Sequence, residues 1–293
     1  MKRGILLSLA ILIIGIVTPL TAGASSGAYA ALGDSVAAGA GLAGGTVPCD
    51  RSSESYPYSV AQSTGLPLQH LACTGAKIDE GLYDEQSRSG TVQPAQIQQA
   101  FMGGTPSLVT ITIGANDARW TQFIRQCYYI RCGYAVDSAR FAAYLVDMKL
   151  ELNVALAKIH SLSGGSPPQV ILTGYYQPFS NTATCTGTDR LTTAEITWLN
   201  RRTELLNQAI SGTVSKYSFA DFAPVSFAGH DICSADPWIQ SASDSAPFHP
   251  TATGQAAIAR AALAEYRQSP PVATDAQSYR EQALNWLSRH EDW

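Results

Sequence analysis

Short apolar runs alternate along this chain with longer stretches of helical periodicity, and this alternation is the feature that most limits its fold. The clearest runs are Leu108–Ile113 and Val170–Tyr175, with similar runs at Ala28–Leu32 and Ser218–Phe222. Leu66–Leu71 is a weaker candidate because a proline follows its first residue. Strands that are separated by helices pair in parallel rather than as hairpins. The pattern therefore predicts an α/β fold with a mostly parallel, five-stranded sheet.

Three further segments carry the helical repeat. Apolar side chains recur every three or four residues over Phe141–Ile159 and over Leu191–Ile210, where Thr192 or Thr193 is the expected N-cap. A third helix is expected to begin within Thr251–Gln255. These elements predict one domain over residues 28–266. A linker and a short amphipathic helix are expected over residues 267–293.

The N-terminus has the pattern of an export signal. Lys2 and Arg3 precede an apolar core, Ile5–Val17, and Pro19 ends it before the small residues of Ala22–Ala24. An uncleaved membrane anchor is the alternative, but the core is short of the roughly 20 residues that span a bilayer. We predict a signal peptide over residues 1–24 and a secreted protein that is not stably inserted in a membrane.

Six cysteines in an exported chain favour disulfides. Cys127 and Cys132 enclose a small loop and are expected to pair. Cys49–Cys73 and Cys185–Cys233 are then the simplest remaining pairs, because each joins neighbours in the sequence. A zinc site is the alternative, but the chain has no CxxC pair and no histidine at ligand spacing. We therefore predict three disulfides and no metal.

Charge narrows the range of partners. The 293 residues carry a formal net charge of −4, and only 14% of them are charged. Such a balance offers no electrostatic reason for binding nucleic acid or an anionic membrane. We expect a monomer that acts on a small-molecule or lipid substrate without a cofactor.

Residues suited to acyl transfer follow three of the predicted strands. Ser35 comes after the first strand, Gly75 after the second and Asn116 after the third. The carboxyl ends of parallel strands share one edge of the sheet, so these residues are expected to converge there. Ser35 would be a nucleophile, with its own N–H, the Gly75 N–H and the Asn116 amide as oxyanion donors. The alternative for Ser35 is ordinary helix N-cap chemistry.

In the segments that carry these residues, the chain resembles the SGNH (GDSL) hydrolase superfamily. Its blocks match Gly33-Asp34-Ser35, Gly75, Gly114-Ala115-Asn116-Asp117 and His249. The resemblance is closest to secreted actinobacterial esterases and lipases, a group that three sequential disulfides would also fit. It implies a three-layer α/β/α fold, carboxylic ester hydrolysis and His249 as the general base.

The chain departs from the family pattern at Ala246. The family usually has an aspartate three residues before the catalytic histidine, and here that place holds an alanine. The resemblance to secreted members that lack this acid implies that the carbonyl of Ala246 orients His249. Asp231, Asp236 and Asp244 remain alternative partners through loop geometry.

The sequence leaves several functions open. A carbohydrate O-deacetylase or an acyltransferase would use the same groups as an esterase or lipase. A catalytically silent secreted binding protein on this fold is the alternative from another class. Candidate cleft residues, each with plain packing as its alternative, are Arg119, Trp120, Tyr175, Tyr176 and Phe179.

Overall fold

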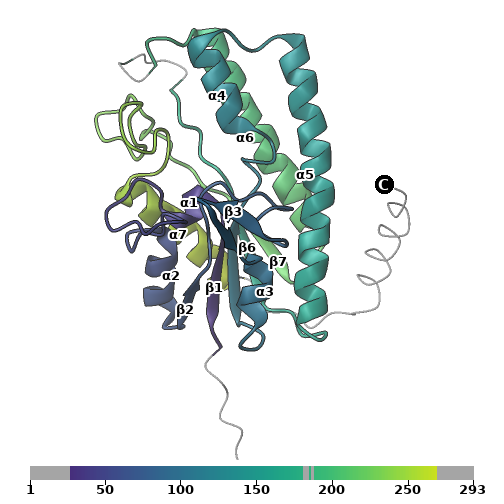
Figure 1. Ribbon diagram of the computed structural model, residues 1–293. Coiled ribbons are helices and arrows are strands. Elements are labelled where there is room, and N and C mark those ends of the chain that lie inside the picture. Colours follow the sequence, from purple (N-terminus) through teal and green to yellow (C-terminus); the bar gives the residue numbers. More distant parts are fainter. Residues whose placement is uncertain (1–26, 181–184, 186–187, 269–293) are drawn as a thin grey trace, which may run out of the picture.

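A five-stranded sheet forms the centre of the molecule. The computed structural model describes residues 27–180, 185 and 188–268. All five strands are parallel and lie in the order β2-β1-β5-β6-β7 (Figure 1). They are β2 (Leu68–His70), β1 (Tyr29–Gly33), β5 (Leu108–Thr112), β6 (Gln169–Thr173) and β7 (Ala220–Ala223). Every residue of β1, β5 and β6 is buried, as is typical of a parallel sheet covered on both faces.

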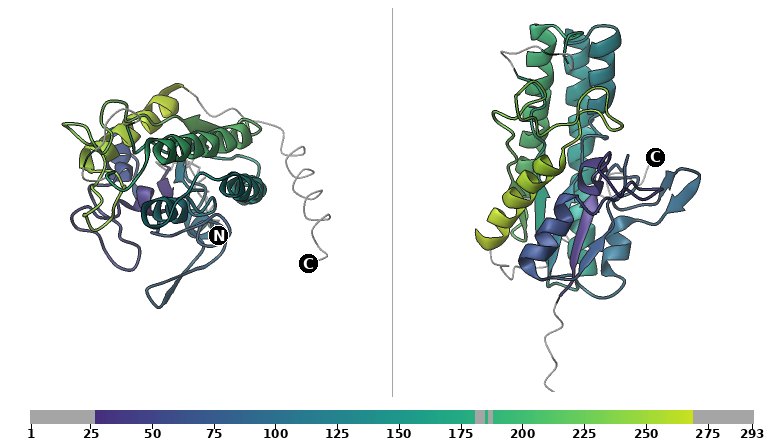
Figure 2. Two further views of the ribbon diagram at one scale, coloured as in Figure 1. Left: turned by 90° about the horizontal axis from the view of Figure 1, so that it is seen from above. Right: turned by 90° about the vertical axis from the view of Figure 1, so that its left-hand side faces the viewer.

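Helices on both faces of the sheet complete three layers. Helix α2 packs against α7 on one face, and α5 packs against α3 and α6 on the other (Figures 1 and 2). The helices are α1 (Ser35–Ala38), α2 (Tyr56–Thr64), α3 (Gln96–Phe101), α4 (Trp120–Tyr129), α5 (Ala135–Leu162), α6 (Thr193–Val214) and α7 (Ala252–Gln268). The predicted α/β fold with a five-stranded parallel sheet is confirmed.

The long predicted helices are present, with clear caps. Thr192 begins α6 with a capping box, because its hydroxyl accepts from the Glu195 N–H at 3.2 Å while the Glu195 carboxylate accepts from the Thr192 N–H at 2.9 Å. Helix α7 continues to Gln268, two residues past the predicted domain limit at residue 266. The predicted signal peptide over 1–24 and all but the first two residues of the predicted tail lie outside the described residues.

The sequence analysis missed the shorter elements. These are α2, α3, α4 and an antiparallel hairpin of β3 (Gln86–Arg88) and β4 (Thr91–Gln93). Helix α4 has no sequence signal at its start, because its N-cap is Arg119 in a left-handed conformation (φ 53°) without a side-chain cap. Short elements of this kind depend on tertiary packing more than on local pattern.

All three predicted disulfides are present: Cys49–Cys73, Cys127–Cys132 and Cys185–Cys233. The first joins the loop after α1 to the loop after β2. The second links the last turn of α4 to the segment that enters α5. Among the described helices, none has the length and apolar character needed to cross a bilayer.

Candidate active site

The turn that carries Ser35 is shaped by the residues before it. Ser35 is the first residue of α1 and follows β1 almost directly. Gly33 has a φ of +134°, and a Cβ at this position would collide with the carbonyl oxygen of Thr112. The Gln96 side chain holds Gly33 from α3, accepting from its N–H at 2.6 Å and donating to its carbonyl at 3.0 Å. Only glycine allows β1 to turn so sharply beside β5.

A buried carboxylate and a tyrosine link this turn to the next strand-end loop. One oxygen of Asp34 caps α1 by accepting from the Val36 N–H at 2.9 Å, and the other accepts from the Tyr175 hydroxyl at 2.6 Å. The same hydroxyl accepts from the Ala115 N–H at 3.2 Å. Burial raises the pKa of Asp34 to about 6, against the opposing effect of these hydrogen bonds. The capping expected at this turn is therefore performed by Asp34, which leaves the Ser35 hydroxyl available.

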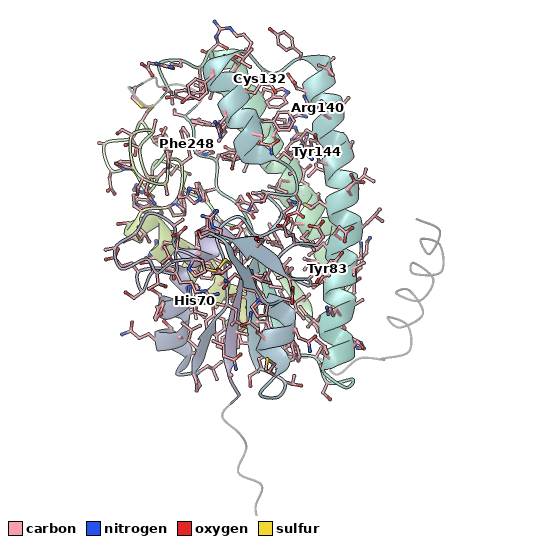
Figure 3. The ribbon with its side chains drawn as sticks, in the orientation of Figure 1. His70, Tyr83, Cys132, Arg140, Tyr144 and Phe248 are labelled. Carbon is pink, nitrogen blue, oxygen red and sulfur yellow. A yellow bond between two sulfur atoms is a disulfide. The ribbon has the colours of Figure 1, made fainter. Side chains whose placement is uncertain are left out.

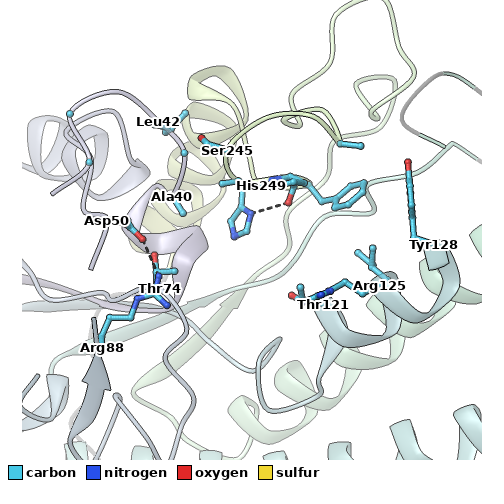
Figure 4. A pocket seen from close by; sticks show the side chains of 18 of the residues that line it. Ala40, Leu42, Asp50, Thr74, Arg88, Thr121, Arg125, Tyr128, Ser245 and His249 are labelled. Carbon is cyan, nitrogen blue, oxygen red and sulfur yellow. Dashed lines mark hydrogen bonds and ion pairs between the residues drawn. The ribbon is translucent and has the colours of Figure 1, made fainter. Parts of the chain in front are cut away.

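His249 meets the serine from the far end of the domain. Its Nε2 lies 2.7 Å from Ser35 Oγ, although the residues are 214 positions apart. Its Nδ1 lies 3.1 Å from the carbonyl oxygen of Pro247, the interaction drawn in Figure 4. Burial lowers the pKa of His249, while the carbonyls of Pro247 and Ala246 oppose that shift. A neutral imidazole with Nε2 facing a hydroxyl is suited to accept a proton.

The hydrogen bond of Nδ1 in the structure is to the Pro247 carbonyl, and the Ala246 carbonyl that the sequence analysis expected there also acts favourably on the imidazolium. The carbonyl of Ala246 accepts from the main-chain N–H of His249 at 3.3 Å. The alternative partners Asp231, Asp236 and Asp244 interact within their own loops. Among the described residues, no carboxylate is hydrogen-bonded to His249.

The loop before His249 holds a strained residue that the sequence did not reveal. Phe248 has a φ of 66°, a left-handed conformation that costs a non-glycine residue about 1–2 kcal/mol. The Tyr176 hydroxyl donates to the Phe248 carbonyl at 2.7 Å, and the Phe248 N–H donates to the Gln240 carbonyl at 3.1 Å. The Gln240 N–H in turn donates to the His249 carbonyl at 2.7 Å. These bonds fix the direction in which the imidazole points.

The three candidate oxyanion donors lie on neighbouring loops. The Asn116 amide donates to the Ala76 carbonyl at 2.8 Å, which brings the loop after β5 against the loop that carries Gly75. Gly75 has a φ of +84°. Within the described chain, the N–H groups of Ser35 and Gly75 have no hydrogen-bond acceptor. Both are therefore available to a ligand.

Asp117 also links the loop after β5 to the loop that carries Gly75. Its Oδ1 accepts from the Ile78 N–H at 3.0 Å, while its Oδ2 is buried without a hydrogen-bond partner. Burial raises the pKa of this carboxyl to about 7, and Asp34 adds to the effect by repulsion. Asp117 therefore acts as a support for the loops and does not contact His249.

A large cavity opens beside His249. Its volume is about 820 Å³, and its walls include Leu42, Arg88, Arg125, Tyr128 and His249 (Figure 4). Figure 4 shows the α4 side chains on one wall and the loops after α1 and β2 on the opposite wall. The alkyl and aromatic side chains suit an apolar substrate, and the two arginines suit a polar or anionic part of it.

A smaller pocket of about 60 Å³ touches Ser35 and Asn116 directly. Trp120, Tyr175 and Tyr176 line it, as the sequence analysis suggested for cleft residues. Phe179 lies instead in the packing around Phe248, and the Arg119 guanidinium lies over the Tyr144 ring at 4.8 Å. Among the described residues, no group of three or more His, Cys, Asp and Glu side chains could hold a metal ion.

Comparison with known proteins assigns the family. The model of the GDSL-like lipase/acylhydrolase family matches residues 31–257. The chain belongs to this family. The chain is 31% identical over 238 residues to a lipase of Streptomyces rimosus, covering 78% of this chain and 82% of that protein. It is 29% identical over 244 residues to Lipase 1 of Streptomyces coelicolor, covering 79% and 84% of the two chains.

Solved structures agree with this assignment. The crystal structure of an extracellular lipase from Streptomyces rimosus has a TM-score of 0.66 and 27% identity, covering 83% of this chain and all of that one. A phospholipase A1 from Streptomyces albidoflavus has a TM-score of 0.61 and 26% identity, covering 83% and 99%. The protein is thus a carboxylic ester hydrolase with the fold that the motif resemblance implied.

Proposed function

We propose that Ser35 and His249 form a catalytic dyad that hydrolyses esters through an acyl-enzyme. The observation that carries the proposal is the 2.7 Å distance between Ser35 Oγ and His249 Nε2. Oγ attacks the ester carbonyl carbon while its proton passes to Nε2. The tetrahedral intermediate then collapses, and the leaving alkoxide takes this proton and departs as the alcohol. Water attacks the acyl-enzyme, giving its proton to Nε2, and Oγ leaves with that proton as the free serine hydroxyl.

The oxyanion of each tetrahedral intermediate is assigned to three donors. They are the N–H groups of Ser35 and Gly75 and the side-chain amide of Asn116. The free N–H groups described above support this assignment, as does the bond from Asn116 to the Ala76 carbonyl, which fixes the direction of the amide. One such donor is worth about 10²–10³ in kcat in other acyl-transfer enzymes.

His249 acts in this proposal without a carboxylate. The carbonyl of Pro247 accepts from Nδ1–H at 3.1 Å and selects the tautomer that has its lone pair on Nε2. The neighbouring Ala246 carbonyl adds a second favourable dipole for the imidazolium. A neutral carbonyl stabilises this cation less than a carboxylate would. The carbonyls therefore orient the imidazole fully but stabilise its protonated form only in part.

The proposed substrates are lipid esters. The large cavity supports this choice through the alkyl and aromatic part of its walls, and relatives described as lipases and a phospholipase A1 support it independently. Carbohydrate O-deacetylation and acyl transfer are the alternatives. A comparison of p-nitrophenyl acetate with p-nitrophenyl decanoate separates a deacetylase from a lipase, because a lipase with this cavity is expected to prefer the decanoate.

Hydrolysis of p-nitrophenyl esters by Ser35→Ala tests the dyad. The rate is expected to fall at least about a thousandfold. Ser245→Ala is the matched control, because Ser245 also lines the large cavity but, among the described residues, is not a hydrogen-bond partner of His249. Equal rates for Ser35→Ala and the wild type would show that another group is the nucleophile.

We further propose that the protein is exported and acts outside the cell as a monomer, without a nucleic-acid partner. The three disulfides support export, as does the similarity to an extracellular lipase. N-terminal sequencing of the protein from culture medium tests the predicted cleavage after Ala24.

A further inference from the structure

The mouth of the large cavity continues into an exposed apolar surface. Tyr129, Ile130, Tyr134 and Val136 are 70%, 75%, 58% and 61% exposed. They lie within eight consecutive residues at the junction of α4 and α5. The Cys127–Cys132 disulfide links the chain at this junction. Figure 3 places Cys132 at the end of the helices that extends beyond the sheet. Such clusters of exposed apolar side chains mark interaction sites.

Positive charge surrounds these side chains. Arg125 is one helical turn before Tyr129 and is exposed, and the exposed Arg190 guanidinium lies 6.0 Å from the centre of the Tyr129 ring. Arg131 is also largely exposed. The protein carries a formal net charge of −4, so a cluster of three arginines is unusual for this chain. The sequence analysis did not detect it because the arginines come from two distant segments.

Nearby carboxylates balance part of this positive charge. In the segments 125–137 and 188–195 the acidic residues are Asp137, Asp189 and Glu195. Asp137 and Glu195 are buried and accept hydrogen bonds within the fold, and Glu195 also forms an ion pair with Arg131 at 3.8 Å. Asp189 alone among these three is exposed. The surface therefore combines tyrosine and aliphatic side chains with the exposed guanidinium groups of Arg125 and Arg190, neither of which forms an ion pair with another described residue.

We propose that this surface, formed by Arg125, Tyr129, Ile130, Arg131, Tyr134 and Val136, docks the enzyme on an anionic lipid surface. The inference rests on the proposed hydrolysis of lipid esters. Tyrosine and arginine side chains are favoured where apolar and aqueous phases meet, and apolar side chains beside them enter the lipid. We call this group of six residues the docking surface.

Continuity with the active site favours a lipid surface over a protein partner. Arg125 and Tyr129 belong both to the docking surface and to the wall of the cavity that ends at His249. A folded protein bound here would cover the cavity mouth and exclude the substrate. A lipid surface would instead present its ester groups to that mouth.

Vesicle binding by the full chain carrying Ser35→Ala tests the proposal without hydrolysis. Sedimentation with phosphatidylcholine–phosphatidylglycerol vesicles is compared with sedimentation with phosphatidylcholine vesicles. The mixed vesicles are expected to bind more tightly, and high salt is expected to reduce the difference. Adding Ile130→Asp is expected to weaken binding at least about tenfold, because an apolar side chain that enters lipid is replaced by an anion.

Met102→Asp is the matched control. Ile130 and Met102 are both C-cap residues of helices, and both side chains are more than 70% exposed. Met102 follows α3 and precedes β5, so it lies near the edge of the sheet opposite the active site. Binding by Met102→Asp is expected to equal that of the parent protein.

Activity assays separate this inference from the proposed function. In the chain with Ser35 intact, Ile130→Asp is expected to leave hydrolysis of soluble p-nitrophenyl acetate unchanged and to lower hydrolysis of esters held in vesicles. Equal vesicle binding by Ile130→Asp and Met102→Asp would overturn the inference, as would a concentration-dependent dimer that Ile130→Asp abolishes. An inert wild type whose Ser35→Ala variant still binds vesicles would instead contradict the proposed hydrolysis and leave the docking surface supported.

Discussion

Tyr175→Phe is the substitution that most directly tests how the active site is held. The Tyr175 hydroxyl donates to Asp34 at 2.6 Å and accepts from the Ala115 N–H at 3.2 Å. It therefore connects the turn of the proposed nucleophile Ser35 with the loop of the proposed oxyanion donor Asn116. Removing one oxygen atom breaks both bonds and leaves the ring in place.

The cost in stability follows from the two bonds. A hydrogen bond to an ionised group contributes about 1.5–3 kcal/mol, and a buried N–H without a partner costs about 1–3 kcal/mol. We expect Tyr175→Phe to lower the free energy of unfolding by about 3 kcal/mol, since partial rearrangement offsets part of the loss. Tyr29→Phe is the control, because Tyr29 is also buried and hydrogen-bonds to Thr110 at 2.6 Å on a part of the sheet remote from Ser35. It is expected to cost about 1 kcal/mol.

The two variants are expected to differ in catalysis. In Tyr175→Phe the positions of Ser35 and Asn116 are no longer coupled, and a displacement of about 1 Å can cost about 100-fold in rate. We expect kcat for p-nitrophenyl esters to fall between about tenfold and 100-fold, with little change in KM. Tyr29→Phe is expected to keep the wild-type kcat.

A pH profile adds a signature that a loss of packing would not produce. The bond from Tyr175 lowers the pKa of Asp34, so its removal raises that pKa further above about 6. Because protonation of Asp34 weakens its cap on the Ser35 turn, the loss of kcat at acid pH is then expected to begin at a higher pH than in the wild type. If Tyr175→Phe loses stability but keeps the wild-type kcat and pH profile, the reasoning about coupled loops is wrong.

Three further predictions concern the supports of the site. Asn116→Ala is expected to lower kcat about 10²–10³-fold with little effect on KM, measured with p-nitrophenyl esters, whereas an unchanged kcat would exclude Asn116 from the oxyanion hole. The pKa of Asp117 is about 7 against an ordinary 3.8, so the folded state binds more protons than the unfolded state between these values and stability falls as pH rises through them. Asp117→Asn is therefore expected to raise the thermal midpoint by a few degrees at pH 8 and to have little effect at pH 4, and an equal effect at both would contradict this. Replacing the cysteines of Cys49–Cys73 by alanine is expected to cost about 3.5 kcal/mol in denaturant unfolding, against about 2 kcal/mol for Cys127–Cys132, because the first closes the longer loop. The opposite order would show that the loop-entropy argument fails here.

Local sequence patterns were sufficient to predict the strands and the long helices of the molecule. Apolar runs and helical repeats depend on residues close in sequence, so the five strands and the long helices were predicted from them. The pairing of the cysteines also followed, because neighbours along the chain proved to be neighbours in space. Convergence of Ser35 and Asn116 was predictable because parallel strands place their carboxyl ends at one edge.

Only the tertiary structure determined how the proposed catalytic side chains are oriented. Tyr175 reaches Asp34 across 141 residues, and Gln96 reaches Gly33 across 63. No local periodicity encodes such contacts, because they depend on how separate elements pack. The same holds for the left-handed backbone at Phe248 and for the carbonyl that faces His249, which belongs to Pro247 because the loop bends there. The sequence by itself determined the layers of the fold and the order of its reactive residues. Packing between distant elements determined the orientation of those residues and brought arginines from two segments to the mouth of the cavity.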